Sequence, residues 1–370
     1  MQLILTGEQQ ELRSAVRKFL IDQAPPAKVR EAMASDAGYD RDLWRRLGNE
    51  LGLLGLVVPE ERGGAGAGHL ERAVLAEELG RALVPTPFLG SSVLAVDTLL
   101  ALDDDTARAD YLAELASGEG IGAVAVAEDA SGWGRTGGAT TAAQRDGGWR
   151  LDGTKTLVVA GDAADLLLVY AQTPDGPGWF AVDGSAAGLT RTTLGGIDPT
   201  RRLARLTFAG TPARPLTAAD PAAVLDVVSD LAAVALAAEQ VGGMERAIEL
   251  TVDYAKVRVQ FGRPIGSYQA VKHGLADMYS AWEHAVSVAR HAAWAADHDR
   301  SELPLAAALA RTYIGPAYFE AATGMVQYHG GIGYTWEHDA HLYYKRAKAS
   351  ELLFGPPATH RAKLADLLKI

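Results

Sequence analysis

The hydrophobic period of this sequence changes twice, and that change limits the folds open to the chain. From residue 7 to about 117, apolar residues recur at three-to-four spacing, which is typical of amphipathic helices. From about 118 to 215 the period becomes two, which is typical of half-buried strands. From about 220 to 370 the helical period returns. We therefore expect helices, then strands, then helices again.

The middle segment is expected to form a β domain. Short runs rich in Val, Leu, Tyr, Trp and Phe are strand candidates, and they lie at residues 123–126, 149–151, 166–170, 179–182 and 203–208. They follow one another without helical segments between them. This order indicates an antiparallel barrel or sandwich of about a hundred residues.

The last segment is expected to form an antiparallel four-helix bundle, because it contains long helical stretches with short connections. These stretches lie at about 222–260, 268–297, 304–328 and 341–353. Gly242-Gly243 interrupts the first of them, and each glycine costs a helix about 1 kcal/mol relative to alanine. We therefore expect another helix or a ligand to approach closely there.

These patterns together predict an α+β fold. We expect an N-terminal helical domain at 1–117, a middle antiparallel β-barrel or sandwich domain at 118–218, and a C-terminal four-helix-bundle domain at 219–370.

Composition excludes several classes of function. Lys and Arg number 35 against 46 Asp and Glu, and the net charge of −11 repels nucleic acid. The chain has no cysteine, which excludes thiol nucleophiles and Cys-ligated metals, so redox chemistry needs a bound cofactor. His338 and His341 are three apart, but no third ligand is specified, and we predict no metal site. Without a signal-peptide pattern or a long uncharged apolar run, we expect a cytoplasmic protein that does not bind membranes.

Two motifs point to a ligand. Residues 258–269 read RVQFGRPIGSYQ and join two long helices, while residues 327–334 read QYHGGIGY and end a third. Arg258 can donate two parallel hydrogen bonds to a pyrophosphate, and Gly330-Gly331 allows backbone amides to approach a ligand. Either motif alone is explained as well by a helix cap or a turn. Both together, about 70 residues apart on bundle helices, favour a bound cofactor.

With these motifs the sequence resembles the acyl-CoA dehydrogenase family, and residues 58–64 (VPEERGG) resemble the amino-terminal signature of that family. The resemblance covers essentially the whole chain. It implies an FAD at a subunit interface, with its ring on the β domain of one subunit and its adenosine-diphosphate end on the bundle of the neighbour. The FAD-binding residues that it implies are Arg258, Gln260, Phe261, Gln269, Gln327, Gly330 and Gly331.

The catalytic positions of this family are altered here. In the family, a glutamate removes the α-proton of the thioester while the flavin N5 takes hydride from the β-carbon. The two positions that the family uses for this base fall on Phe354 and Ala232, and neither is a carboxylate. On the ring side, the family's Thr-Glu-Pro is matched by residues 127–129 (AED), and its Trp-x-Thr by residues 157–159 (LVV). The adenosine side is retained, whereas the ring side and the base are not.

We therefore expect a subunit of an FAD-dependent acyl-CoA dehydrogenase that performs α,β-dehydrogenation of a lipid or steroid CoA thioester. It would form a hetero-oligomer with a second, base-bearing acyl-CoA dehydrogenase subunit and complete that partner's FAD site. One alternative is a self-sufficient homo-oligomer with Asp230 or Glu239 as an unconventional base, although a lone carboxylate on a helix is more often solvated or paired. Another is a binding or scaffold chain that has lost flavin.

Overall fold

The computed structural model describes residues 3–129, 133, 138–145 and 147–370. The chain forms two compact units. The first combines Met1–Glu31, His69–Val84 and Ala233–Ile370, and the second combines Ala32–Gly68 and Pro85–Ala232. The division into three domains at residues 117 and 218 stays a prediction.

The first unit is helical. Its elements, including those that it shares in part with the second unit, are α1 (Gly7–Gln23), α2 (Pro26–Ala34), α4 (His69–Ala82), α7 (Pro221–Val257), the hairpin β8 (Val259–Gln260) and β9 (Arg263–Pro264), α8 (Gln269–His298), α9 (Leu303–His329), the 3₁₀ helix η6 (Gly330–Tyr334), α10 (Ala340–Leu352) and α11 (Pro357–Leu368).

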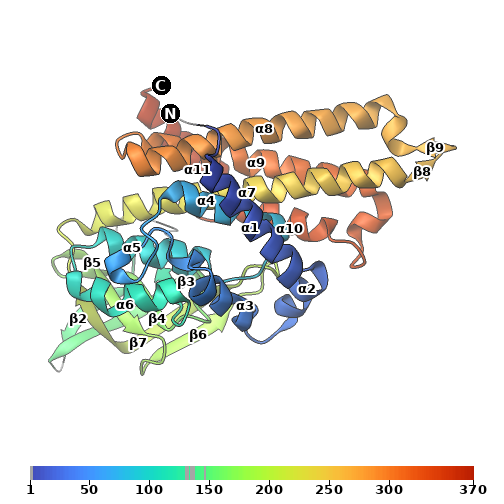
Figure 1. The fold of residues 1–370 in the computed structure, drawn as a ribbon. Coiled ribbons are helices and arrows are strands. Elements are labelled where there is room, and N and C mark those ends of the chain that lie inside the picture. The colour runs from blue at the N-terminus through green and yellow to red at the C-terminus, as the bar shows by residue number, and fades with distance from the viewer. Residues whose placement is uncertain (1–2, 130–132, 134–137, 146) are drawn as a thin grey trace. The chain divides into compact units, whose positions relative to one another are not determined.

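The expected long helices of the C-terminal segment are confirmed. Helices α7, α8 and α9 run side by side with the β8–β9 hairpin at one end (Figure 1), and α9 also packs against α10 and α11. The expected close approach at Gly242-Gly243 is confirmed too. A Cβ on Gly242 would overlap the carbonyl oxygen of Glu77 on α4, and a Cβ on Gly243 would overlap the hydroxyl of Tyr318 on α9. Gly80 of α4 meets the carbonyl oxygen of Glu239 in the same way, so glycines on both helices let α4 and α7 touch.

Helix α7 is long and apolar enough to span a membrane by length and composition. However, 67% of its most apolar 18-residue window is buried inside the protein. Its apolar side chains therefore pack mainly against the rest of the protein, as they do in the core helix of a folded domain.

Helix α4 receives its N-terminal cap from α8. The carboxylate of Asp297 accepts hydrogen bonds from the backbone amides of His69 at 2.7 Å and Leu70 at 3.0 Å. An aspartate that satisfies free amides at a helix start stabilises the helix, and its charge also suits the positive end of the helix dipole.

The second unit contains the β-sheet and several short helices. The helices are α3 (Arg41–Arg45), α5 (Val96–Ala101) and α6 (Asp105–Ser117). The strands are β1 (Gly122–Ala125), β2 (Thr141–Arg145), β3 (Gly148–Val159), β4 (Leu166–Thr173), β5 (Gly176–Asp183), β6 (Leu189–Thr193) and β7 (Leu203–Leu216).

The strands form one sheet that closes on itself. The order is β1-β4-β2-β3-β7-β5, β6 pairs with β7, and a further β4–β5 pairing closes the ring. The α+β class and the barrel are therefore confirmed. The expectation of a fully antiparallel sheet needs one correction, because β1 pairs with β4 in parallel, from Gly122 opposite Leu166 onward, and Thr141 of β2 pairs with Gln172 of β4 in parallel as well. The chain passes through the β2–β3 hairpin before it returns as β4, so β1 and β4 are not joined as a hairpin.

Candidate functional site

The two sequence motifs meet at one end of the helical bundle. The rings of Tyr254 on α7 and His329 on α9 stack with centroids 4.4 Å apart. Arg258 follows Tyr254 by about one helical turn, and Gly330 follows His329 directly. A single stacked pair thus brings together segments that are about 70 residues apart in sequence, next to the β8–β9 hairpin (Figure 1).

The hairpin holds Phe261 outward. The backbone amide of Ile265 donates to the carbonyl of Arg258 at 2.7 Å, and the hydroxyl of Tyr268 donates to the carbonyl of Gln260 at 3.0 Å. The guanidinium of Arg263 lies 4.0 Å from the centre of the Tyr268 ring. Phe261 at the tip is 94% exposed, and its φ of 50° is strained for a bulky residue. Such a side chain contributes nothing to the core of this chain.

All of the residues that the resemblance implies for FAD lie exposed, and they are Arg258, Gln260, Phe261, Gln269, Gln327, Gly330 and Gly331. The amide of Gln260 donates to the carbonyl of Val259 at 2.8 Å. Within the described part of the chain, the guanidinium of Arg258 has no hydrogen bond and no ion pair. Because its guanidinium N–H groups donate to no described residue of its own chain, Arg258 is available to an anionic ligand.

The ring-side position Leu157 lies on a strained segment of the second unit. Strand β3 is irregular between Lys155 and Val158, where its register with β7 shifts. Leu157 has a φ of 52° and is 45% exposed. Its side chain is thus held away from the core by an unfavourable backbone.

The segment before Leu157 is anchored by a buried ion pair. The ammonium of Lys155, which is fully buried, donates to the carbonyl of Val126 at 3.0 Å and to Oε1 of Glu128 at 2.8 Å. Glu128 also accepts from the backbone amides of Ala139 at 2.6 Å and Thr140 at 3.0 Å. Burial raises the pKa of Glu128, but the hydrogen bonds from Lys155 and the two amides outweigh it and lower the pKa to about 2.

The first position that the family uses for its base lies in a tight turn, and a phenylalanine stands there in place of a carboxylate. Phe354 is half-buried with a φ of 63°, and Gly355 follows with a φ of 110°. The carbonyls just before them are held by Arg311, whose guanidinium is buried and donates to Ser350 at 3.0 Å and Leu353 at 2.7 Å. Arg311 was not predicted from the sequence. A lone arginine within the mostly apolar stretch 303–328 was the signal that could have found it.

Several of the positions that the family resemblance singles out have a strained backbone. Among the described residues, six non-glycine residues have a positive φ. Leu157, Phe261 and Phe354 are three of them, and they correspond to the ring, adenosine and base positions of the resemblance. Strain of this kind concentrates at functional sites, because elsewhere a glycine or a relaxed turn removes its cost.

The other proposed bases are buried. Ala232 presents only a methyl group and is fully buried. Glu239 is 9% exposed, and its Oε1 accepts a hydrogen bond from Arg346 at 2.8 Å. The carboxylate of Glu239 is thus already engaged by a guanidinium of its own chain. Asp230 is 5% exposed and lies in the part of α7 that belongs to the second unit.

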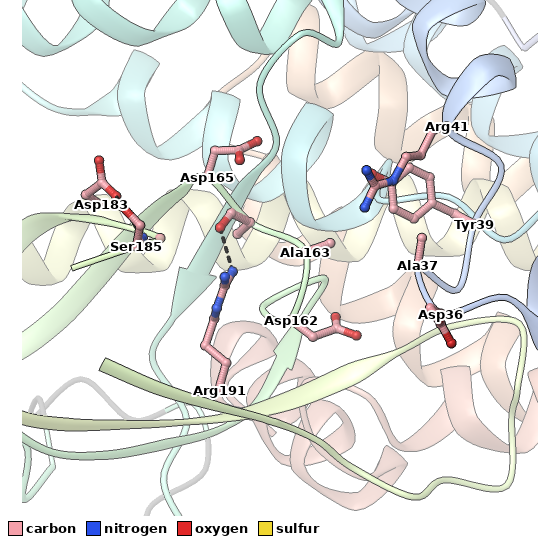
Figure 2. A pocket seen from close by; sticks show the side chains of 12 residues that line it. Asp36, Ala37, Tyr39, Arg41, Asp162, Ala163, Asp165, Asp183, Ser185 and Arg191 are labelled. Atoms are coloured by element: carbon pink, nitrogen blue, oxygen red, sulfur yellow. Dashed lines mark hydrogen bonds between the residues drawn. The ribbon is translucent and has the colours of Figure 1, made fainter. Parts of the chain in front are cut away.

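A cavity of about 600 Å³ lies in the second unit (Figure 2). Its charged lining consists of Asp36, Arg41, Asp162, Asp165, Asp183 and Arg191. Two of these side chains fix the surrounding loops. Arg191 donates to the carbonyl of Ala164 at 2.9 Å, and Asp165 accepts from the amide of Ile121 at 2.9 Å. A lining so rich in charge does not suit an acyl chain, which needs apolar walls, and none of these residues was singled out by the sequence.

Comparison with known proteins agrees with the sequence motifs. Family models for the acyl-CoA dehydrogenase N-terminal domain and C-terminal domain match residues 6–119 and 229–368. The acyl-CoA dehydrogenase IpdE2 of Mycobacterium tuberculosis is 42% identical over 353 residues, which cover 95% of this chain and 94% of that protein. The chain belongs to the acyl-CoA dehydrogenase family.

Solved acyl-CoA dehydrogenase structures share the whole fold. A variant of the Tcur3481-Tcur3483 steroid ACAD is 33% identical with a TM-score of 0.89, and the match covers 98% of each chain. The ChsE4-ChsE5 complex from Mycobacterium tuberculosis is 30% identical with a TM-score of 0.90, and the match covers 100% of this chain and 99% of that one. Both are named as pairs of different proteins. The chain is thus an acyl-CoA dehydrogenase-type oxidoreductase, and its similar structures include two-protein assemblies.

Proposed function

We propose that this chain is the base-lacking subunit of a cytoplasmic, hetero-oligomeric acyl-CoA dehydrogenase that acts on a lipid or steroid CoA thioester. The observation that carries the proposal is the exposed end of the bundle. There Arg258 has no partner among the described residues, and Phe261 is held outward at a cost in backbone strain. Both features are explained if a neighbouring subunit brings an FAD against this end.

The residues present fit the anionic and adenosine parts of FAD. The guanidinium of Arg258 would bind the pyrophosphate, and the exposed ring of Phe261 would pack on the adenosine. Gly330 and Gly331 carry no side chain and stand in open space, so their amides can approach the cofactor closely. The glutamines at 269 and 327 would bind neutral polar edges.

The chemistry would be divided between the subunits. When bound, FAD supplies the acceptor for the hydride that leaves the β-carbon of the thioester. The α-proton must pass to a carboxylate, and this chain offers only a phenyl ring at Phe354 and a methyl group at Ala232. The partner subunit would therefore supply the base, while this chain binds and orients the nucleotide end of the cofactor.

The test is FAD retention by the purified complex. The chain is co-expressed with a base-bearing acyl-CoA dehydrogenase subunit from the same genome, and flavin absorbance per subunit is measured. Arg258→Ala removes a charge-assisted contact and is expected to weaken FAD binding by roughly tenfold to a hundredfold. Arg46→Ala, at a solvent-exposed arginine paired with Glu50, is the matched control and should retain FAD. Equal flavin in both variants, or a stable flavin-replete monomer of the chain alone, would contradict the proposal.

A further inference from the structure

A second cavity, of about 370 Å³, lies within the first unit. It is lined by α1 and the turn that follows it, by the end of α4, and by one residue each of α2, α7 and α10. None of the residues assigned to FAD lines it. Its volume is in the range of sites that take small molecules.

One wall of the cavity is apolar. Its residues are Leu20, Ile21, Ala24, Pro25, Pro26 and Ala82. Leu20 is almost fully buried, whereas Ile21 is 66% exposed and therefore lies at a rim that is open to solvent. The two prolines fix the backbone of the turn, so this wall is largely preformed.

The opposite wall carries three guanidinium groups, those of Arg17, Arg81 and Arg246, beside the carboxylate of Glu78 and the hydroxyl of Tyr343. The hydroxyl of Tyr343 donates to the carbonyl of Arg81 at 2.7 Å. The guanidinium groups belong to a larger network in which Arg13, Arg17, Arg81 and Arg246 pair with Glu78, Glu245 and Glu249. Four cations against three anions leave the network with one excess positive charge.

The network also leaves hydrogen-bond donors unused. Arg17 binds Glu78 and Glu245 through Nε and Nη2, and no bond is found from its Nη1 among the described residues. Arg246 donates through Nη1 to Glu249 at 3.0 Å, and neither its Nε nor its Nη2 has a partner in the same described part of the chain. Each guanidinium has five N–H donors and no acceptor, so these free donors can be satisfied only by an acceptor such as an anion or water.

We propose that this cavity binds a carboxylate that carries a compact apolar body, such as a free medium-chain carboxylic acid. The carboxylate would accept hydrogen bonds from Arg17 and Arg246, and the apolar body would lie against Leu20, Ile21 and the two prolines. The excess positive charge disfavours a cationic ligand. An inorganic anion would leave the apolar wall unused, so the two walls together select an amphipathic acid.

Calorimetry with sodium octanoate tests the proposal on the full chain. Octan-1-ol has the same apolar body without the charge, and inorganic phosphate has charge without the apolar body. Octanoate is expected to bind at least tenfold more tightly than either. Equal affinity for octan-1-ol would overturn the role of the arginines, and equal affinity for phosphate would overturn the role of the apolar wall.

Variants locate the site. Arg246→Gln leaves Glu249 paired with Arg81, and it is expected to weaken octanoate binding at least tenfold. Ile21→Asp, at the exposed rim, should weaken binding by a similar factor because its carboxylate repels that of octanoate. Arg46→Gln and Leu51→Asp make matched changes at exposed positions outside the cavity and should bind as the native chain does. Circular dichroism verifies folding of each variant. Octanoate affinity that is unchanged in Ile21→Asp and Arg246→Gln, or absent from the native chain, would overturn the proposal.

Discussion

The buried ion pair between Lys155 and Glu128 gives the sharpest stability prediction. Glu128→Gln keeps the size of the side chain but removes its charge. The ammonium of Lys155, which is fully buried, then faces a neutral amide in place of the carboxylate that compensates its charge. We expect the second unit to lose about 3 kcal/mol of unfolding free energy at pH 7, because removing one member of a buried pair leaves the other charge uncompensated.

The pKa of Glu128 gives a similar magnitude. Its fall from an ordinary 4.5 to about 2 corresponds to about 3 kcal/mol of stabilisation of the charged form in the folded state. The sign follows from the lowered value. The stabilisation is fully present above pH 4.5, and it is lost as the pH falls from 4.5 toward 2, because the unfolded chain takes up the proton first.

Urea unfolding followed by tryptophan fluorescence measures this loss, since Trp149 and Trp179 lie in the same sheet as the pair. Glu50→Gln, at an exposed i,i+4 pair with Arg46, is the matched control and should cost less than about 0.5 kcal/mol. The difference between the native chain and Glu128→Gln should be constant from pH 7 to about 4.5 and shrink below that. A difference under about 0.5 kcal/mol at pH 7, or one that stays the same down to pH 3, would refute the reasoning.

Three further outcomes follow from the structure. Asp297→Ala removes the cap of α4 and should lower the unfolding free energy by about 1 kcal/mol in urea, whereas no change would show that solvent replaces the cap. Leu157→Gly should raise the urea midpoint of the second unit, because glycine relieves a positive φ that costs about 1 kcal/mol; a lower midpoint would mean that the leucine packs in the core. Burial, together with the charges of Lys345 and Arg30, lowers the pKa of His341 to about 4, so stability should fall as the pH drops from 6.5 to 4; an NMR titration with a pKa near 6.5 would contradict this.

The sequence predicted those elements whose pattern is local. Each of the five expected strands lies at a strand of the structure, because short apolar runs are buried there, as in β1 and β4. Strands β2 and β6 were missed, since both are mostly exposed and polar and so carry no alternation. Helix α11 was also missed. It has no buried residue, and its sequence lacks the apolar stripe that marks an amphipathic helix.

The candidate site was predicted through motifs, and its supporting contacts were not. Arg258 and Gly330 could be selected from sequence because residue type and spacing both suggest a ligand. The stack of Tyr254 on His329, which brings the two motifs together, joins residues distant in sequence and needs the folded bundle to be seen. The clamp of Arg311 on the carbonyls before Phe354 was missed for the same reason. The cavity lined by Arg17 and Arg246 likewise depends on the packing of five helices, which no local pattern reveals.

Steady-state turnover with an artificial electron acceptor tests the central claim most directly. The chain alone and the chain co-expressed with a base-bearing partner are compared on the same acyl-CoA thioester, each with FAD content measured. Because neither Phe354 nor Ala232 can accept a proton, the chain alone should turn over about 10² to 10⁴-fold more slowly than the pair. Turnover by the lone chain at the rate of the pair, abolished by Asp230→Asn or Glu239→Gln, would contradict the partner-subunit assignment and establish a self-sufficient enzyme.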